Sequence, residues 1–186
     1  LGDVYKRQDL TRERIMECAK AEFLKKGFQA AQLKDIVAAA KVTTGAVYRH
    51  FKDKEALFFA LIEDVYHYTL DFLDNVESYD TVGIKEAIER DSIESSYMQA
   101  MKYVNYMYEH FEEYQLLLKY SKGSRVENFI EEIADQYTKQ NAQFVKAAYE
   151  AGYAKCLPSD IEIHILTHGY ITCLLYTSPS PRDPKT

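Results

Sequence analysis

Apolar side chains recur at helical spacing along nearly the whole chain. In the first part Ile15, Ala19 and Phe23 lie four residues apart, which places them on one face of a helix over about residues 11–26. Gly27 follows this pattern directly and is predicted to end the helix, with Phe28 folding back onto it. No stretch alternates apolar and polar residues as a half-buried strand does. The pattern therefore predicts an all-α fold.

Two short helices, separated by a tight turn, are predicted next. The first lies near residues 33–40, and the second begins after Thr43, whose hydroxyl can cap a helix N-terminus. Val47 and Phe51 form the apolar anchor of the second helix. Asp53 is then predicted to cap a long fourth helix with an apolar stripe from Leu57 onward. Three short helices with such a turn are typical of a helix-turn-helix head.

The second half of the chain has the same helical spacing in longer segments. A helix is predicted over about residues 125–151, after a break at residues 122–124 and before Gly152. Its apolar positions alternate four and three residues apart, which is the spacing of a helix–helix seam. Pro158-Ser159-Asp160 is predicted to start a last helix, whose residues 161–172 are apolar nearly all round. We expect such a helix to be buried on several sides.

Composition narrows the class of protein. The chain has 186 residues and is 47% apolar, which suits one sizeable core or a small domain attached to a larger one. No apolar run approaches the roughly 20 residues that cross a bilayer, and no signal-peptide pattern opens the chain, so we expect a cytoplasmic protein without a membrane partner. The three cysteines form no Cys-x-x-Cys pair and are interpreted as reduced thiols.

Both ends of the chain differ in character from the part between them. Three of the four prolines fall after Tyr176, and residues 3–8 and 173–183 resemble translated sequencing-library adaptor. We therefore expect residues 1–8 and 173–186 to be non-native, with a native sequence that continues beyond Thr172. The alternative is a natural disordered tail. Either way, the ends are left out of the fold prediction.

The distribution of charge along the chain matters more than the net charge. A formal net charge of −6 argues against a nucleic-acid partner. Residues 9–54, however, hold ten Lys or Arg and six Asp or Glu, a net charge of +4, whereas residues 55–176 hold nine and twenty-one, a net charge of −12. A basic head on an acidic body is the asymmetry expected when only the head meets phosphate.

The third short helix carries side chains suited to reading DNA. Thr43, Thr44, Tyr48, Arg49 and His50 all form hydrogen bonds, and Lys52 and Lys54 follow at once. A helix fits the major groove of B-DNA, where residues near its N-terminus reach the base edges and other polar groups hold phosphates. Gly45 adds no side-chain bulk and allows close approach. The alternatives are that Tyr48 only packs and that Arg49 and His50 are only solvated.

These residues also resemble a known family. Gly45, Tyr48, Phe51, Lys54 and Leu57 follow one another at a spacing of three, and with Gly27-Phe28 and residues 35–37 they look like the tetracycline-repressor (TetR) family over residues 12–62. The resemblance implies a homodimer that binds a palindromic double-stranded DNA operator and responds to a small-molecule effector of unidentified structure. It implies a DNA-binding domain over residues 9–54 and a helical ligand-binding and dimerisation domain over residues 55–172.

Site residues follow from the resemblance by position. Thr43, Thr44 and Arg49 would face bases, Gly45 would lie at the groove floor, and Tyr48, His50 and Lys54 would hold phosphates. The chain departs from the family pattern twice. Lys41 replaces a glycine in the turn and would need a positive φ, or the turn would differ. Gln32, with Lys34 beside it, replaces the Thr or Ser that opens the second helix and is a weaker phosphate donor.

The resemblance also implies sites in the acidic body. The effector pocket is assigned to Tyr66, Tyr97, Met101, Asn105 and Tyr137, although tyrosines in a helical bundle more commonly just pack. The dimer interface is assigned to the seam and to the last helix, at Val126, Ile130, Ile133, Tyr137, Phe144, Ile161, Ile165 and His168. His164 and His168 share a helix face as metal ligands can, but no further ligand lies nearby in sequence, so packing or dimerisation is the preferred interpretation.

Other classes of protein fit the sequence less well. An enzyme would need a nucleophile elbow, a phosphate-binding glycine loop or a metal-ligand cluster, and none is present in the sequence, so we expect no catalytic residues, metal or cofactor. A helical protein-interaction module without DNA binding remains the alternative. The hydrogen-bonding face at residues 43–50 favours a ligand-responsive transcriptional regulator, in most cases of this kind a repressor.

Overall fold

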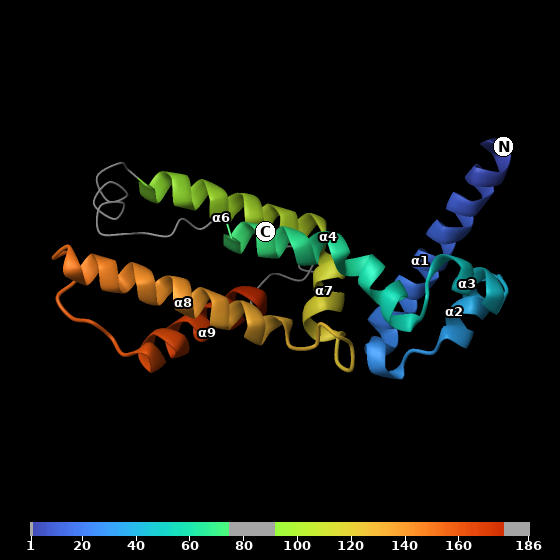
Figure 1. Ribbon diagram of the computed structural model, residues 1–186. Helices are drawn as coiled ribbons and strands as arrows, with labels where there is room; N and C mark the ends of the chain where they lie inside the picture. Colours follow the sequence, from blue (N-terminus) through green and yellow to red (C-terminus); the bar gives the residue numbers. More distant parts are fainter. Residues whose placement is uncertain (1, 75–91, 177–186) are drawn as a thin grey trace, which may run out of the picture. The chain divides into compact units, whose positions relative to one another are not determined.

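The structure is a computed structural model that describes residues 2–74 and 92–176, and Figure 1 shows its helices. Within these ranges there are eight helices and no strand, which confirms the all-α prediction. The helices are α1 (Gly2–Ala30), α2 (Leu33–Ala40), α3 (Thr44–His50), α4 (Lys54–Asp74), α6 (Ser92–Glu109), α7 (Phe111–Lys119), α8 (Phe129–Glu150) and α9 (Asp160–Tyr176). Among the described helices, none has the length and apolar character that a membrane span requires.

The chain folds into two compact units. The first unit holds residues up to Thr69 together with Met107–Glu127, and the second holds Leu70–Tyr106 and the residues from Asn128 onward. Helices α4 and α6 therefore each contribute residues to both units. The sequence-based domain boundary after residue 54 stays a prediction.

Three phenylalanines form the centre of the first unit. Phe23 of α1 stacks on Phe28 with ring centroids 6.0 Å apart, and Phe58 of α4 meets both rings edge-on at 5.0 and 5.1 Å. Phe28 can turn back in this way because Gly27 interrupts the helical backbone with φ 74° and ψ 164°. That combination lies in a region of backbone space that is open essentially to glycine alone. The predicted break at Gly27 and the return of Phe28 are confirmed.

The predicted caps around α3 are also confirmed. The Thr43 hydroxyl accepts a hydrogen bond from the Ala46 N–H at 3.2 Å, and the Asp53 carboxylate accepts one from the Ala56 N–H at 2.7 Å. Lys41 ends α2 in the left-handed conformation, with φ 53° and ψ 42°. The turn therefore keeps the geometry that glycine usually supplies, and Lys41 adopts it at an energetic cost.

Helix α7 and the loop after it pack on the helices of the first unit. The Lys20 ammonium of α1 lies 2.6 Å from a Glu113 oxygen and 3.1 Å from a Glu112 oxygen of α7. Desolvation acts to lower the pKa of Lys20, but the hydrogen bonds to Glu113 and Glu112 outweigh it and raise that pKa. The Phe28 N–H donates to the Tyr120 carbonyl at 2.8 Å. These contacts join α7 and its C-terminal cap to the interior of α1 at Lys20 and to its C-terminal end at Phe28.

The loop from Ser121 to Asn128 differs from the sequence-based expectation. The seam helix was predicted from about residue 125, whereas α8 begins at Phe129. Residues 124–127 instead form turns, in which the Glu127 N–H donates to the Ser124 carbonyl. The Arg125 guanidinium stacks 3.6 Å from the centre of the Phe59 ring, and its backbone N–H reaches Glu55 of α4. These contacts to α4 hold the segment in place as a loop.

In the second unit, α8 and α9 lie side by side and run antiparallel. The start of α9 is a capping box, in which the Ser159 N–H donates to the Glu162 carboxylate at 2.8 Å and the Glu162 N–H donates back to the Ser159 hydroxyl at 3.4 Å. The Ser159 hydroxyl also donates to the Glu162 carboxylate, at 2.7 Å, and this hydrogen bond, together with the one from the Ser159 N–H, lowers the pKa of Glu162. On α6, the Tyr103 ring stacks on Phe72 of α4 at 4.5 Å.

Candidate nucleic-acid interface

Helix α3 separates its apolar and polar side chains onto opposite faces. Val47 and Phe51 are 2% and 5% exposed and anchor the helix in the first unit. Thr43, Thr44, Gly45 and Arg49 are exposed, and the Tyr48 side chain is 53% exposed although it is aromatic. The fold therefore presents hydrogen-bonding groups, rather than apolar ones, along the outer face of this short helix.

Gly45 is not required by the fold. Its φ is not positive, and a Cβ added there would meet only the Thr43 hydroxyl oxygen, at 4.0 Å. An alanine would also be the better helix former. A glycine that neither the backbone nor the packing demands is consistent with a surface that another molecule approaches closely.

The start of α2 contributes two further polar side chains. Gln32 occupies the N-cap position but makes no side-chain capping bond, and its side chain is exposed. Lys34 is exposed one residue inside the helix. Asp35 is instead paired with Lys26 of α1 at 2.9 Å, a hydrogen bond that lowers the pKa of Asp35. Gln32 and Lys34 are therefore exposed, and their contact with phosphate stays a prediction, while Asp35 serves the packing of α1 on α2.

The remaining two predicted phosphate contacts differ in their surroundings. His50 is half-buried beside Phe51, with ring centroids 6.4 Å apart. The Lys54 ammonium is directed inward, toward the carbonyl oxygens of Phe28 at 2.8 Å and Ala31 at 3.2 Å. The phosphate contact of Lys54 stays a prediction, and these carbonyls are its partners in the structure.

The residues predicted for an effector pocket are spread over both units. Tyr66 belongs to the first unit and meets the Phe59 ring edge-on at 5.5 Å. Met101 and Asn105 lie exposed on α6 in the second unit. Tyr137 lies in the second unit as well, and its burial raises its pKa. The Tyr97 side chain lies outside the described residues. The pocket stays a prediction.

The residues predicted for a dimer interface fall into two groups. Val126 and Ile133 are 5% and 4% exposed, because they are buried within their own chain. Ile130, Tyr137 and His168 are half-buried. Phe144, Ile161 and Ile165 are exposed, at 39%, 68% and 62%. Two further residues of α9, which the sequence analysis does not single out, are also exposed: Leu166 at 71% and Tyr170 at 63%.

These exposed side chains form what we call the apolar face of α9: Ile161, Ile165, Leu166 and Tyr170. Their spacing of four, one and four residues keeps them on one side of a helix. The sequence pattern alone could not separate them from Ile163 and Ile171, which are 5% and 4% exposed, because residues 161–172 are apolar nearly all round. The expectation that this helix is buried on several sides is not met within one chain.

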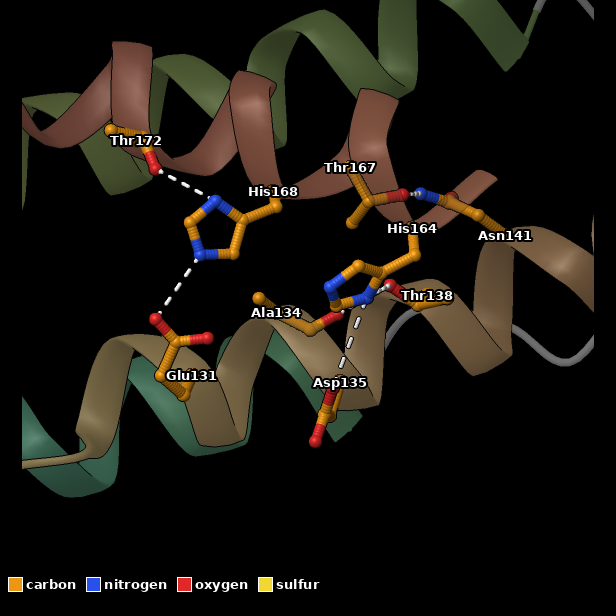
Figure 2. A network of polar contacts seen from close by, with 9 residues as sticks. All are labelled: Glu131, Ala134, Asp135, Thr138, Asn141, His164, Thr167, His168 and Thr172. Carbon is orange, nitrogen blue, oxygen red and sulfur yellow. Dashed lines mark hydrogen bonds and ion pairs between the residues drawn. The ribbon is translucent and has the colours of Figure 1, made fainter. Parts of the chain in front are cut away.

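A network of polar contacts crosses the seam between α8 and α9, as Figure 2 shows. The Asn141 amide donates to the Thr167 hydroxyl at 2.9 Å, and His168 Nε2 lies 3.2 Å from a Glu131 oxygen. The Thr138 hydroxyl donates its single hydrogen to the Ala134 carbonyl, so it can only accept from His164 Nδ1, 3.2 Å away. The seam fixes the register of the two helices through paired polar groups.

The two histidines of this seam face different partners. His168 is directed at Glu131, while His164 is directed at Thr138 and lies 3.9 Å from Asp135. Within the described residues, no three His, Cys, Asp or Glu side chains are grouped so as to hold a metal ion. The pairing of α8 with α9 accounts for both histidines.

Comparison with known sequences bears on the N-terminal part of the chain. Residues 15–61 match the family described as "Bacterial regulatory proteins, tetR family". The chain is 42% identical over 73 residues to the HTH-type transcriptional regulator TtgR of Pseudomonas putida, a match that covers 39% of this chain and 34% of TtgR. It is 40% identical over 52 residues to the HTH-type transcriptional regulator UidR of Escherichia coli, covering 28% and 26% of the two chains. The matches thus span about a third or less of these relatives.

Comparison with solved structures extends over nearly the whole chain. A γ-butyrolactone receptor (ArpA-like protein) has a similar fold, with a TM-score of 0.56 at 19% identity over 91% of this chain and 82% of the receptor. NalD, the secondary repressor of the MexAB-OprM multidrug efflux pump in Pseudomonas aeruginosa, has a TM-score of 0.52 at 20% identity over 91% and 84%. At these identities the likeness establishes the fold. Together with the match over residues 15–61, it shows that this chain carries the N-terminal helix-turn-helix domain of the TetR family on a TetR-like all-α fold.

Proposed function

We propose that this protein is a DNA-binding transcriptional regulator, in its basal state a repressor, that binds a palindromic operator as a homodimer. One observation carries the proposal. Helix α3 is anchored by buried Val47 and Phe51 and turns an exposed hydrogen-bonding face outward, at the position where a helix-turn-helix inserts its second helix into the major groove.

The exposed residues divide into two roles on DNA. Thr43, Thr44 and Arg49 lie along the outer face of α3, where side chains reach base edges. Tyr48 and His50, with Gln32 and Lys34 at the start of α2, would hold phosphates and set the register of the helix in the groove. Each phosphate that a lysine or arginine neutralises releases counterions, so affinity should fall steeply as salt rises.

The apolar face of α9 supports the homodimer. A helix normally turns its apolar residues inward and its polar residues to solvent. Here the seam with α8 is bridged by Asn141, Thr138 and Glu131, while Ile161, Ile165 and Leu166 are more than half exposed. A contiguous apolar patch of this kind marks an interaction surface, and a second copy would supply a self-complementary partner. Pairing of this face would hold two heads together for a two-fold symmetric operator.

A small-molecule effector completes the proposed regulator. Binding in the helical body would shift the population of states toward one in which the two heads no longer match half-sites about one helical turn apart. Tyr137 is half-buried, and the burial that raises its pKa places a hydroxyl within the second unit, where it would orient such a ligand. The chemical class of the effector is left open.

The test is selection of bound duplexes from a random DNA pool. Wild type is compared with the double variant Tyr48→Ala/Arg49→Ala, and both are first checked for equal helicity and thermal stability. The proposal predicts that wild type enriches a palindrome and that the double variant enriches nothing. If a folded, dimeric wild type enriches no sequence, the proposal fails and a helical protein-interaction module takes its place.

A further inference from the structure

Lys54 lies at the junction that closes the helix-turn-helix. Ala31 comes two residues before α2 begins at Leu33, and Lys54 comes four residues after α3 ends at His50. The Lys54 ammonium donates to the Ala31 carbonyl at 3.2 Å. This single hydrogen bond joins the entrance of the two-helix motif to its exit.

The ammonium group has a second set of partners on the same side. It donates to the Phe28 carbonyl at 2.8 Å and lies 4.3 Å from the centre of the Phe28 ring. A lysine ammonium has three N–H donors and no acceptor. Two donors go to the carbonyls of Phe28 and Ala31, and the ring face takes the third direction as a cation–π contact. In this structure the ammonium is thus held by protein groups.

Phe28 is itself held firmly, so it can act as an anchor. Its ring is 6% exposed and packs against Phe23 and Phe58, and its N–H donates to the Tyr120 carbonyl. At the other end, Lys54 follows Asp53, whose carboxylate caps α4. The ammonium therefore connects two points that the fold has already fixed, and α2 and α3 lie between them.

We propose that Lys54 is a positioning residue of the DNA-binding head, which closes the helix-turn-helix onto the end of α1 and acts on DNA through the orientation of α3. This inference rests on the proposed DNA-binding function and replaces, for this one residue, the phosphate contact that the family resemblance implied. The carbonyls at the end of α1 lack helical partners, and an ammonium is well suited to satisfy them.

Salt dependence of DNA binding separates positioning from phosphate contact. Affinity for the selected duplex is measured against salt concentration for wild type and for Lys54→Met, which keeps the length of the side chain and removes its charge. A positioning residue predicts an affinity about tenfold lower, since charge-assisted hydrogen bonds are lost, with an unchanged slope of log affinity against log salt. A phosphate contact predicts instead that the magnitude of the slope falls by about 1 per protomer, and that result would overturn the inference.

Amide hydrogen exchange gives a readout that does not depend on DNA. Lys54→Met should speed exchange in α2 and α3 while leaving α8 and α9 unchanged. The matched control is Lys52→Met, which removes the same charge from an exposed side chain in the same loop and should leave exchange in α2 and α3 as in wild type. Equal exchange in both variants would contradict the inference. If Lys54→Met does not fold, Lys54→Gln, whose uncharged amide retains two N–H donors, is put through both measurements.

The two measurements also keep the inference distinct from the proposed function. If wild type binds no duplex, the regulator proposal fails, whereas the exchange measurement still decides whether Lys54 closes the motif. If wild type binds DNA and exchange is unaffected by Lys54→Met, the regulator proposal stands and the inference about Lys54 is wrong.

Discussion

The helix-turn-helix head and the α8–α9 hairpin expose different kinds of side chain. In the head, Phe23 and Phe58 are fully buried, and the exposed face of α3 is polar. In the hairpin, the seam holds the pairs Asn141–Thr167 and Glu131–His168, and the exposed face of α9 is apolar. In the proposed regulator, the polar face of the head would offer hydrogen bonds to DNA. The apolar face of α9 would offer apolar area to a second copy of the chain.

The largest expected effect contrasts a buried with an exposed apolar side chain. Phe58→Ala should lower the free energy of unfolding by about 3–5 kcal/mol, because it leaves a cavity between Phe23 and Phe28. Leu166→Ala should cost little in dilute protein and show its effect only at concentrations where the protein pairs. Denaturant unfolding at two protein concentrations measures both. If Leu166→Ala lowered the free energy of unfolding as much as Phe58→Ala does, and equally at both protein concentrations, the contrast between a buried and an exposed apolar side chain would be refuted.

Two glycines of the head should separate folding from DNA binding. Gly27→Ala should cost about 1–3 kcal/mol of stability, because its φ of 74° and ψ of 164° are strained for any residue with a Cβ. Gly45→Ala should leave stability unchanged or slightly higher, since its backbone and surroundings accept a Cβ. It should nevertheless weaken DNA binding. Thermal unfolding and duplex titration of both variants measure the two effects, and a stability loss at Gly45 equal to that at Gly27 would refute the distinction.

The sequence predicted the head far better than the hairpin, for physical reasons. Each feature of the head had a local signal: the glycine at 27, the capping residues Thr43 and Asp53, and the positive φ at Lys41. In the hairpin the information is non-local. Residues 161–172 are apolar nearly all round, so their pattern could not say which side would meet α8. The polar partners on α8 lie 26 or 37 residues away, and nothing in the pattern pairs them.

Lys54 and the α7 segment show the same limit inside the head. The spacing from Gly45 to Leu57 marks Lys54 as part of a motif but does not say where its ammonium points. The carbonyls that it meets depend on the break at Gly27, which redirects the chain after α1. Likewise, the salt bridges of Lys20 with Glu112 and Glu113 link residues about ninety positions apart, which no local pattern reveals.

The polar seam of the hairpin should respond to single and double changes differently. Asn141→Ala should lower the free energy of unfolding by about 1 kcal/mol. It removes the amide that donates to the Thr167 hydroxyl, and Thr167 is only 4% exposed, so water cannot replace that donor. The double variant Asn141→Leu/Thr167→Val should recover most of that loss, since both polar partners are then replaced together. Chemical unfolding of wild type, of the single variants Asn141→Leu and Thr167→Val and of the double variant measures this cycle. Additive losses in the double variant would show that the pair does not act as a unit.

The smallest expected effect is a gain in stability within the head. Lys41→Gly should raise the free energy of unfolding by about 0.5–1 kcal/mol, because glycine relieves the steric strain of the left-handed backbone at φ 53°. The greater conformational freedom of glycine in the unfolded chain offsets part of this gain. Lys41→Ala is the control that removes the side chain and keeps the strain. A gain of equal size in both variants would locate the effect in the side chain rather than in the backbone.

Hydroxyl-radical footprinting on the selected duplex tests the joint claim of a polar reading head and an apolar pairing face most directly. Wild type is compared with Ile165→Glu/Leu166→Glu, which places two charges on the apolar face of α9. The account predicts two symmetric protected half-sites about one helical turn apart for wild type, with much weaker protection by the double variant at the same concentration. Equal protection by both proteins, or a single asymmetric site with wild type, would contradict it.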